Sequence, residues 1–159
     1  HSWTSNTVMN VKKLSTLQEI QVNYERNYGK TTISDSSKAQ SICREAFILT
    51  KANIQLKEYF YFILLNRANE VIGYHKLSEG GISGTVADIR LAYSTAIKCL
   101  ASGMILCHNH PSGNIKPSQA DIKLTQKFKE AGKILDVQLT DHIILTETSH
   151  FSFADEGIL

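Results

Sequence analysis

The length and composition of the chain point to one small globular domain. Of its 159 residues, 42% are hydrophobic and 20% are charged, and the formal net charge is only +2. These values exclude an intrinsically disordered chain, and the longest apolar run, Tyr59–Asn66, is far shorter than the ~20 residues that a membrane-spanning helix needs. The three cysteines form no CxxC pair, which is typical of reduced thiols. We therefore expect a cytoplasmic protein that has no membrane partner.

The first residues of the chain are expected to lie outside this domain. The segment His1–Val8 is mostly polar, and the first methionine is Met9. We therefore expect residues 1–14 to be a disordered terminus or an added leader, and residues 15–159 to form the domain. A first strand is predicted near residues 18–26, where apolar and polar residues alternate.

The rest of the chain alternates between strand and helix patterns. Strands are predicted at residues 58–66, 71–77, 82–86, 104–107, 137–145 and 151–153, and helices over 37–51, 89–101 and 119–131. The predicted N-caps are Asp35 or Ser36, Asp88 and Ser118, and Gly132 is expected to end the last helix. The positions expected to be buried on the first two helices are Ala39, Ile42, Cys43, Ala46, Phe47, Leu49, Leu91, Ala92, Thr95, Ala96 and Leu100. This order predicts an α/β fold, a three-layer α-β-α sandwich with a mixed sheet covered on both faces.

Two histidines and an aspartate have the spacing of metal ligands. His108 and His110 follow an apolar strand, and residues i and i+2 of a strand point to the same side. Asp121 stands in the first turn of the next predicted helix, after a loop that carries Gly113 and both prolines of the chain. Two imidazoles and one carboxylate can bind Zn²⁺ and leave a fourth tetrahedral position for water, as in catalytic zinc sites. We therefore expect His108, His110 and Asp121 to bind one Zn²⁺ ion.

The serine that precedes this aspartate suggests a second interpretation. Ser118 and Asp121 are spaced as the two members of a capping box, in which each side chain accepts a hydrogen bond from the other residue's backbone N–H. Taken alone, this pattern more often begins a helix than it binds a metal. The two interpretations are compatible, because an acidic side chain at this position can also reach outward to an ion.

The same residues match a known motif. His108, His110, Ser118 and Asp121 stand at the positions of the JAMM (MPN-plus, JAB-domain) metalloprotease motif, which is His-x-His, seven residues, Ser, two residues and Asp. Over about residues 15–159, the chain resembles the RadC-like branch of that family. The segments that carry this resemblance are Gly81–Thr85, Cys107–Gly113, Lys116–Asp121, Asp141–Ile143 and Ser152–Gly157. The resemblance implies a cytidine-deaminase-like fold of the JAB/MPN kind, a zinc ion and hydrolase chemistry.

The resemblance also implies roles for two catalytic residues. The family uses a glutamate upstream of the histidines, at the start of a buried strand, as the general base. Glu58 is the better match to this glutamate and Glu79 is the second. Ser118 matches the family's serine, which stabilises the oxyanion of a tetrahedral intermediate. The implied reaction is the cleavage of an amide or isopeptide bond in a peptide or protein substrate.

Two alternative functions are also compatible with the sequence. The RadC name carries an association with DNA repair, so the alternative is a non-catalytic accessory factor with nucleic acid as its partner. The residues that bear on it are Lys123, Lys127, Lys129 and Lys133, and such a helix more often presents a solvated face. A metal-binding interaction module without catalysis is the third hypothesis, which the complete motif disfavours. His142 is expected to make a structural hydrogen bond rather than to support a metal ligand.

Overall fold

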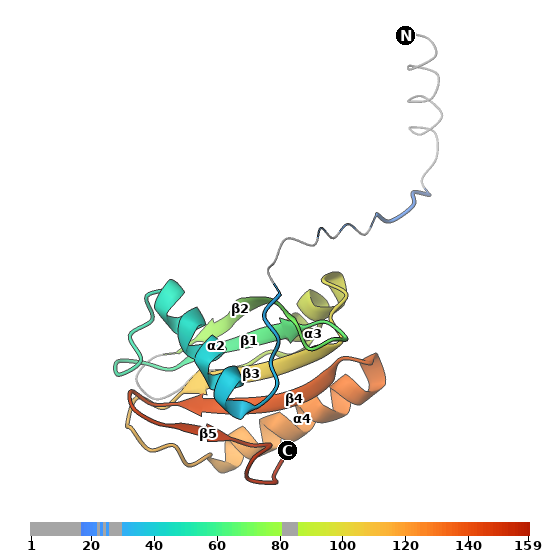
Figure 1. Ribbon diagram of the computed structural model, residues 1–159. Coiled ribbons are helices and arrows are strands. Elements are labelled where there is room, and N and C mark those ends of the chain that lie inside the picture. Colours follow the sequence, from blue (N-terminus) through green and yellow to red (C-terminus); the bar gives the residue numbers. More distant parts are fainter. Residues whose placement is uncertain (1–16, 22, 24, 26–29, 81–85) are drawn as a thin grey trace.

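A mixed sheet of five strands lies between helices in the computed structural model, which describes residues 17–21, 23, 25, 30–80 and 86–159 (Figure 1). The strands, in their order across the sheet, are β2 (Val71–Glu79), β1 (Tyr59–Leu65), β3 (Gly103–Asn109), β4 (Gln138–Leu145) and β5 (His150–Ser152). The helices are α2 (Ser36–Leu49), α3 (Ile89–Lys98) and α4 (Gln119–Leu135). Only β3 and β4 pair in parallel, because α4 carries the chain back between them. None of the helices in the described part is long and apolar enough to cross a bilayer.

The two faces of the interior strand β1 lie in two separate hydrophobic cores. Tyr61 and Ile63 pack with α2 on one face, whereas Phe60 and Phe62 pack with α3 and α4 on the other. Every residue of β1 is buried, as expected for a strand that is covered on both sides. The predicted three-layer α/β sandwich is therefore confirmed.

Two predicted helix faces are wrong at their edges. Leu49, Leu91 and Leu100 were expected to be buried, but they are 61%, 47% and 67% exposed. At about 100° per residue, Leu49 lies beside the buried stripe of α2, and Leu91 points away from the buried stripe of α3. Leu100 lies beyond the end of α3, in a left-handed conformation with φ 54°.

Gly132 does not end the last helix, contrary to the prediction. Helix α4 continues to Leu135 and ends at Asp136, which is left-handed with φ 55°. A side chain at residue 132 would collide with the Val137 carbonyl and would lie 2.8 Å from the Tyr93 hydroxyl. The glycine is therefore needed within α4, where Val137 and Tyr93 pack closely against the helix backbone.

The predicted strand near residues 18–26 is wrong for the residues that the structure describes there. Residues 18–21, 23 and 25 have no strand conformation, and Ile20 is 87% exposed. Alternation of side chains makes a strand only where another strand offers hydrogen bonds. The predicted strand at 82–86 falls mostly outside the described residues, and Val86 is exposed and not in a strand.

Candidate metal centre

The two motif histidines stand where β3 leaves the core. His108 is fully buried, and its ring stacks on that of Phe60 with centroids 5.2 Å apart. His110 follows the last residue of β3, and its backbone N–H donates to the Leu145 carbonyl at 2.9 Å. This bond extends the parallel pairing with β4 beyond the strand, so both histidine rings point to the same side.

The third motif residue comes from the N-terminus of α4. Asp121 and Ser118 form a capping box: the Ser118 N–H donates to Asp121 Oδ2 at 2.9 Å, and the Asp121 N–H donates to Ser118 Oγ at 3.0 Å. The same carboxylate faces both histidines. Capping the helix and contacting the histidines are therefore compatible, because the cap fixes the carboxylate at the end of the helix nearest β3.

Three side chains converge on one point. The Nε2 atoms of His108 and His110 are 3.1 Å apart. Asp121 Oδ1 lies 3.3 Å from His108 Nε2, and its Oδ2 lies 3.2 Å from His110 Nε2. Ligands that share one tetrahedral zinc ion at ordinary bond lengths lie about 3.3 Å apart. The separations of these three groups therefore match the edges of a metal tetrahedron.

A chain of buried hydrogen bonds fixes the proton on the first histidine. Thr125 Oγ1 donates to the Asp121 carbonyl at 2.6 Å, because a carbonyl can only accept. The hydroxyl oxygen of Thr125 therefore accepts a hydrogen bond from the Nδ1–H of His142, also at 2.6 Å. Neutral His142 then accepts at Nε2 from the Nδ1–H of His108, at 2.7 Å. The lone pair of His108 Nε2 consequently faces the convergence point.

The second histidine is oriented in the same sense by a backbone group. His110 Nδ1 lies 2.7 Å from the Asn114 carbonyl, to which it must donate. Its Nε2 lone pair is therefore directed at His108 and Asp121. Two lone pairs and a carboxylate at this separation repel one another unless a cation or a proton lies among them. The donor set fits a divalent cation.

Burial and charge shift the pKa values of this cluster in opposite directions. Burial alone would lower the pKa of His110, but the hydrogen bonds to Asp121 and to the Asn114 carbonyl outweigh it and raise the pKa. Burial would likewise raise the pKa of Asp121, but hydrogen bonds from the two histidine rings, which each ring can donate only when its Nε2 carries a proton, hold it far below its usual range. Burial and repulsion by His108 hold the pKa of His142 well below its ordinary value, so this ring stays neutral.

The two candidate glutamates have different surroundings. A carboxylate oxygen of half-buried Glu58 and one ring nitrogen each of His108 and His110 all lie within 4.8 Å of one another. Glu79 is instead paired with Lys57 at 2.6 Å and with Lys76 at 2.5 Å. Hydrogen bonds from both lysines lower the pKa of Glu79 to about 2. The structure therefore brings Glu58, and not Glu79, to the histidine cluster.

Sequence reasoning missed one member of this cluster and favoured another role for a second member. Thr125 was not singled out, because a threonine inside a helix carries no sign of its partner. His142 was expected to be purely structural, but its hydrogen bond goes to a candidate ligand, so the less favoured interpretation is the one that the structure supports. The sequence separation of 34 residues between His142 and His108 hid this contact.

Comparison with known proteins identifies related sequences. The family model of the RadC-like JAB domain matches residues 33–158. A UPF0758 protein of Flavobacterium johnsoniae is 54% identical over 101 residues, which cover 64% of this chain and 44% of the relative. A UPF0758 protein of Porphyromonas gingivalis is 46% identical over 104 residues, which cover 65% of this chain and 46% of the relative. A UPF0758 protein of Rubrobacter xylanophilus is 35% identical over 134 residues, which cover 84% of this chain and 56% of the relative. The chain thus spans about half the length of these relatives.

Proposed function

Because the chain belongs to the RadC-like JAB domain family, we propose that it is a zinc-dependent hydrolase of the JAMM type, which cleaves an amide or isopeptide bond in a peptide or protein. The observation that carries the proposal is the convergence of His108, His110 and Asp121, whose donor atoms lie 3.1–3.3 Å apart with fixed lone pairs. His142, Thr125 and Asn114 hold those lone pairs in place through buried or backbone contacts.

The donor set favours zinc over harder cations. Two imidazole nitrogens and one carboxylate are ligands that zinc accepts, whereas Ca²⁺ and Mg²⁺ prefer oxygen ligands alone. Three protein ligands are typical of catalytic zinc sites. When bound there, the ion polarises a carbonyl group and makes water a stronger acid.

Glu58 supplies the proton transfer in this proposal. A carboxylate oxygen of Glu58 lies within 4.8 Å of one ring nitrogen of each of the two histidines. It takes a proton from the attacking water and then gives that proton to the leaving amine. Glu79 is unsuited to this role, because two lysines hold its carboxylate and keep it a weak base.

Ser118 supplies a hydrogen bond to the oxyanion in this proposal. Its Oγ already accepts the Asp121 N–H at 3.0 Å, which leaves the hydroxyl proton available to a second partner. The side chain is exposed at the end of α4, where a substrate carbonyl can approach it. A donor of this kind typically lowers the barrier of acyl transfer by about 3–4 kcal/mol.

Metal analysis tests the site directly. We expect the purified chain to hold one zinc ion after dialysis and the His108→Ala variant to hold none. His75→Ala is the matched control, because His75 is an exposed histidine on β2. Equal metal content in all three proteins would reject the site.

Cleavage of a peptide library tests the reaction. The zinc-loaded chain is expected to cut members of the library, and removal of the metal by a chelator is expected to stop the cutting until zinc is restored. A zinc-loaded, folded chain that cuts no peptide and no branched isopeptide substrate would contradict the proposed activity while leaving the metal site intact.

A further inference from the structure

The residue between the two histidines faces the opposite side of β3 and holds a different part of the molecule. Asn109 is fully buried. Its Nδ2 donates to the Ile54 carbonyl at 2.7 Å and to the Lys57 carbonyl at 2.9 Å. Its Oδ1 accepts the Tyr59 N–H at 2.8 Å. Both amide hydrogens of this one side chain are thus bonded to the segment between α2 and β1, and its oxygen is bonded to the first residue of β1.

These hydrogen bonds hold the backbone on both sides of Glu58 in place. Lys57 and Tyr59 are the neighbours of Glu58 in the chain, so Asn109 fixes the peptide groups immediately before and after it. The Glu58 carbonyl is held as well, by the Gly80 N–H at 2.9 Å. The backbone of Glu58 therefore has little freedom to move relative to β3.

We propose that Asn109 is a positioning residue that sets the place of the Glu58 carboxylate relative to the metal ligands. The proposal rests on the function proposed above. Asn109 lies between His108 and His110 in the chain, so its amide links the candidate ligands to the two peptide groups that flank Glu58 through two hydrogen bonds. A third hydrogen bond anchors the same segment at the Ile54 carbonyl. A displacement of reacting groups by about 1 Å can lower a rate about 100-fold, which gives such a link a measurable effect.

The competing explanation is that Asn109 only satisfies buried backbone groups. Asn66 provides the matched comparison, because it holds the turn at the opposite end of β1. Its Oδ1 accepts the N–H groups of Ala68 and Glu70, both at 2.9 Å. A purely structural amide at either end would affect stability alone, whereas a positioning amide at residue 109 would also change the behaviour of Glu58.

The test replaces zinc by Co²⁺, whose visible absorption reports on the metal site without any substrate. The pH midpoint of that absorption is measured for the unaltered chain and for Glu58→Gln, Asn109→Ala and Asn66→Ala. We expect Asn109→Ala to bind Co²⁺ as tightly as the unaltered chain. We expect its midpoint to move in the same direction as that of Glu58→Gln and at least half as far, and the midpoint of Asn66→Ala to stay in place.

The outcomes separate the inference from the function on which it rests. If Glu58→Gln itself leaves the midpoint unchanged, the role proposed for Glu58 fails. If Glu58→Gln moves the midpoint and Asn109→Ala does not, or if Asn109→Ala loses the metal as His108→Ala does, only the positioning role is overturned. On a cleaved peptide, Asn109→Ala is expected to lower kcat by about 10- to 100-fold with KM unchanged.

A more conservative substitution keeps the proposal testable if Asn109→Ala does not fold. Asn109→Ser keeps a polar group at this buried position but is too short to reach all three backbone partners. It is expected to fold, as judged by circular dichroism, and to move the midpoint in the same direction as Asn109→Ala. A folded Asn109→Ser protein with the midpoint and kcat of the unaltered chain would overturn the proposal.

Discussion

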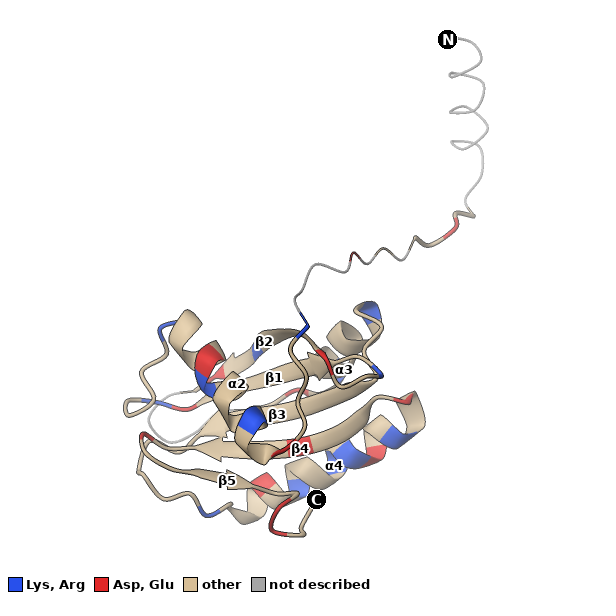
Figure 2. Cartoon of the chain, viewed as in Figure 1, with Lys and Arg blue, Asp and Glu red and all other residues tan. Residues whose placement is uncertain are grey.

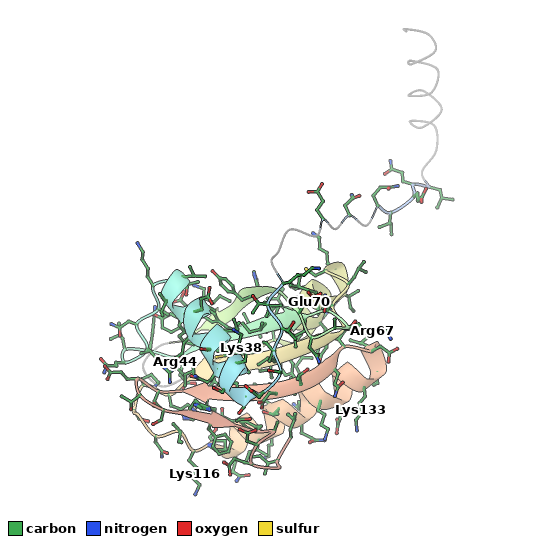
Figure 3. The ribbon with its side chains drawn as sticks, viewed as in Figure 1. Lys38, Arg44, Arg67, Glu70, Lys116 and Lys133 are labelled. Carbon is green, nitrogen blue, oxygen red and sulfur yellow. The ribbon has the colours of Figure 1, made fainter. Side chains whose placement is uncertain are left out.

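The two ends of the central sheet differ in how their polar side chains are held. At the end where β3 leaves the core, His108, Asn109 and His142 are fully buried, and hydrogen bonds hold each of them. At the other end, a cavity of about 820 Å³ opens between the β1–β2 turn and the C-terminus of α4. Its charged lining includes Arg67 and Lys133, both exposed and placed at the same end of the molecule in Figure 3.

The difference teaches that open space and a set of converging donor atoms lie at opposite ends of this sheet. The cationic side chains of the large cavity, Arg67, Lys129 and Lys133, stand among short polar and apolar residues, and Figure 2 shows lysines distributed along α4 rather than gathered at one point. The candidate metal centre is instead defined by groups that have fixed orientations and lone pairs that face one another. Chemistry depends on the second property, because preorganised groups need no rearrangement when they react.

The strongest way to test this contrast is to remove a buried ligand. His108→Ala is expected to abolish zinc binding, measured as metal content after dialysis. It should also lower the free energy of unfolding of the metal-free chain by about 1–3 kcal/mol, since buried His142 loses its donor. Arg67→Ala, at the other end, is expected to change neither quantity, and a comparable loss of metal there would break the comparison.

The next largest effect is expected on turnover. Glu58→Gln should lower kcat on a cleaved peptide by about 10²- to 10⁴-fold, as expected for loss of a general base, with one zinc ion retained. Glu79→Gln is the matched control and should keep most of the activity, because its carboxylate is bound to Lys57 and Lys76. If the two variants lost activity equally, Glu58 would have no special role.

A smaller effect is expected from the group behind the ligands. Thr125→Val keeps the shape of the side chain but removes the hydroxyl that accepts from His142 and donates to the Asp121 carbonyl. Loss of such an outer contact typically weakens metal binding by about 10- to 100-fold. Competition with a chromogenic zinc chelator measures the change. Affinity equal to that of the unaltered chain would show that the hydrogen-bond chain does not tune His108.

The pH dependence of zinc affinity gives a graded test. In the proposed site zinc would bind the unprotonated ring of His110, whose pKa is raised. Affinity should therefore fall as the pH drops through that pKa, by about tenfold per pH unit for each proton displaced. In the metal-free chain the sign reverses. The contact of protonated His110 with Asp121 stabilises the fold below about pH 6.5 and is lost as the pH rises through the raised pKa.

The smallest effect is expected at the large cavity. Lys133→Ala removes an exposed cation from its rim. The free energy of unfolding should change by no more than about 0.5 kcal/mol, and zinc affinity should stay the same. Calorimetric titration with zinc and chemical denaturation measure the two quantities. A marked change in either would show that the two ends of the sheet are coupled.

Much of the fold was predictable because it follows from local patterns. Asp35 and Asp88 cap their helices as predicted, and the aromatic run after Glu58 is a buried interior strand. The predictions failed where the outcome depended on a neighbour. Gly132 follows the sequence rule for a helix end, but the approach of Val137 and Tyr93 decides its role.

The sequence by itself determined the three candidate ligands. His108, His110 and Asp121 stand within fourteen residues on a strand, a loop and a helix start, so their convergence depends mainly on local geometry. Only the tertiary structure showed which of Glu58 and Glu79 lies at the histidine cluster. Both stand at the paired ends of β1 and β2, but Glu58 meets the histidines whereas Glu79 meets two lysines. The supporting contacts of the cluster likewise join residues 17 to 55 positions apart, and their closeness is created by strand pairing and helix packing, which no local pattern encodes.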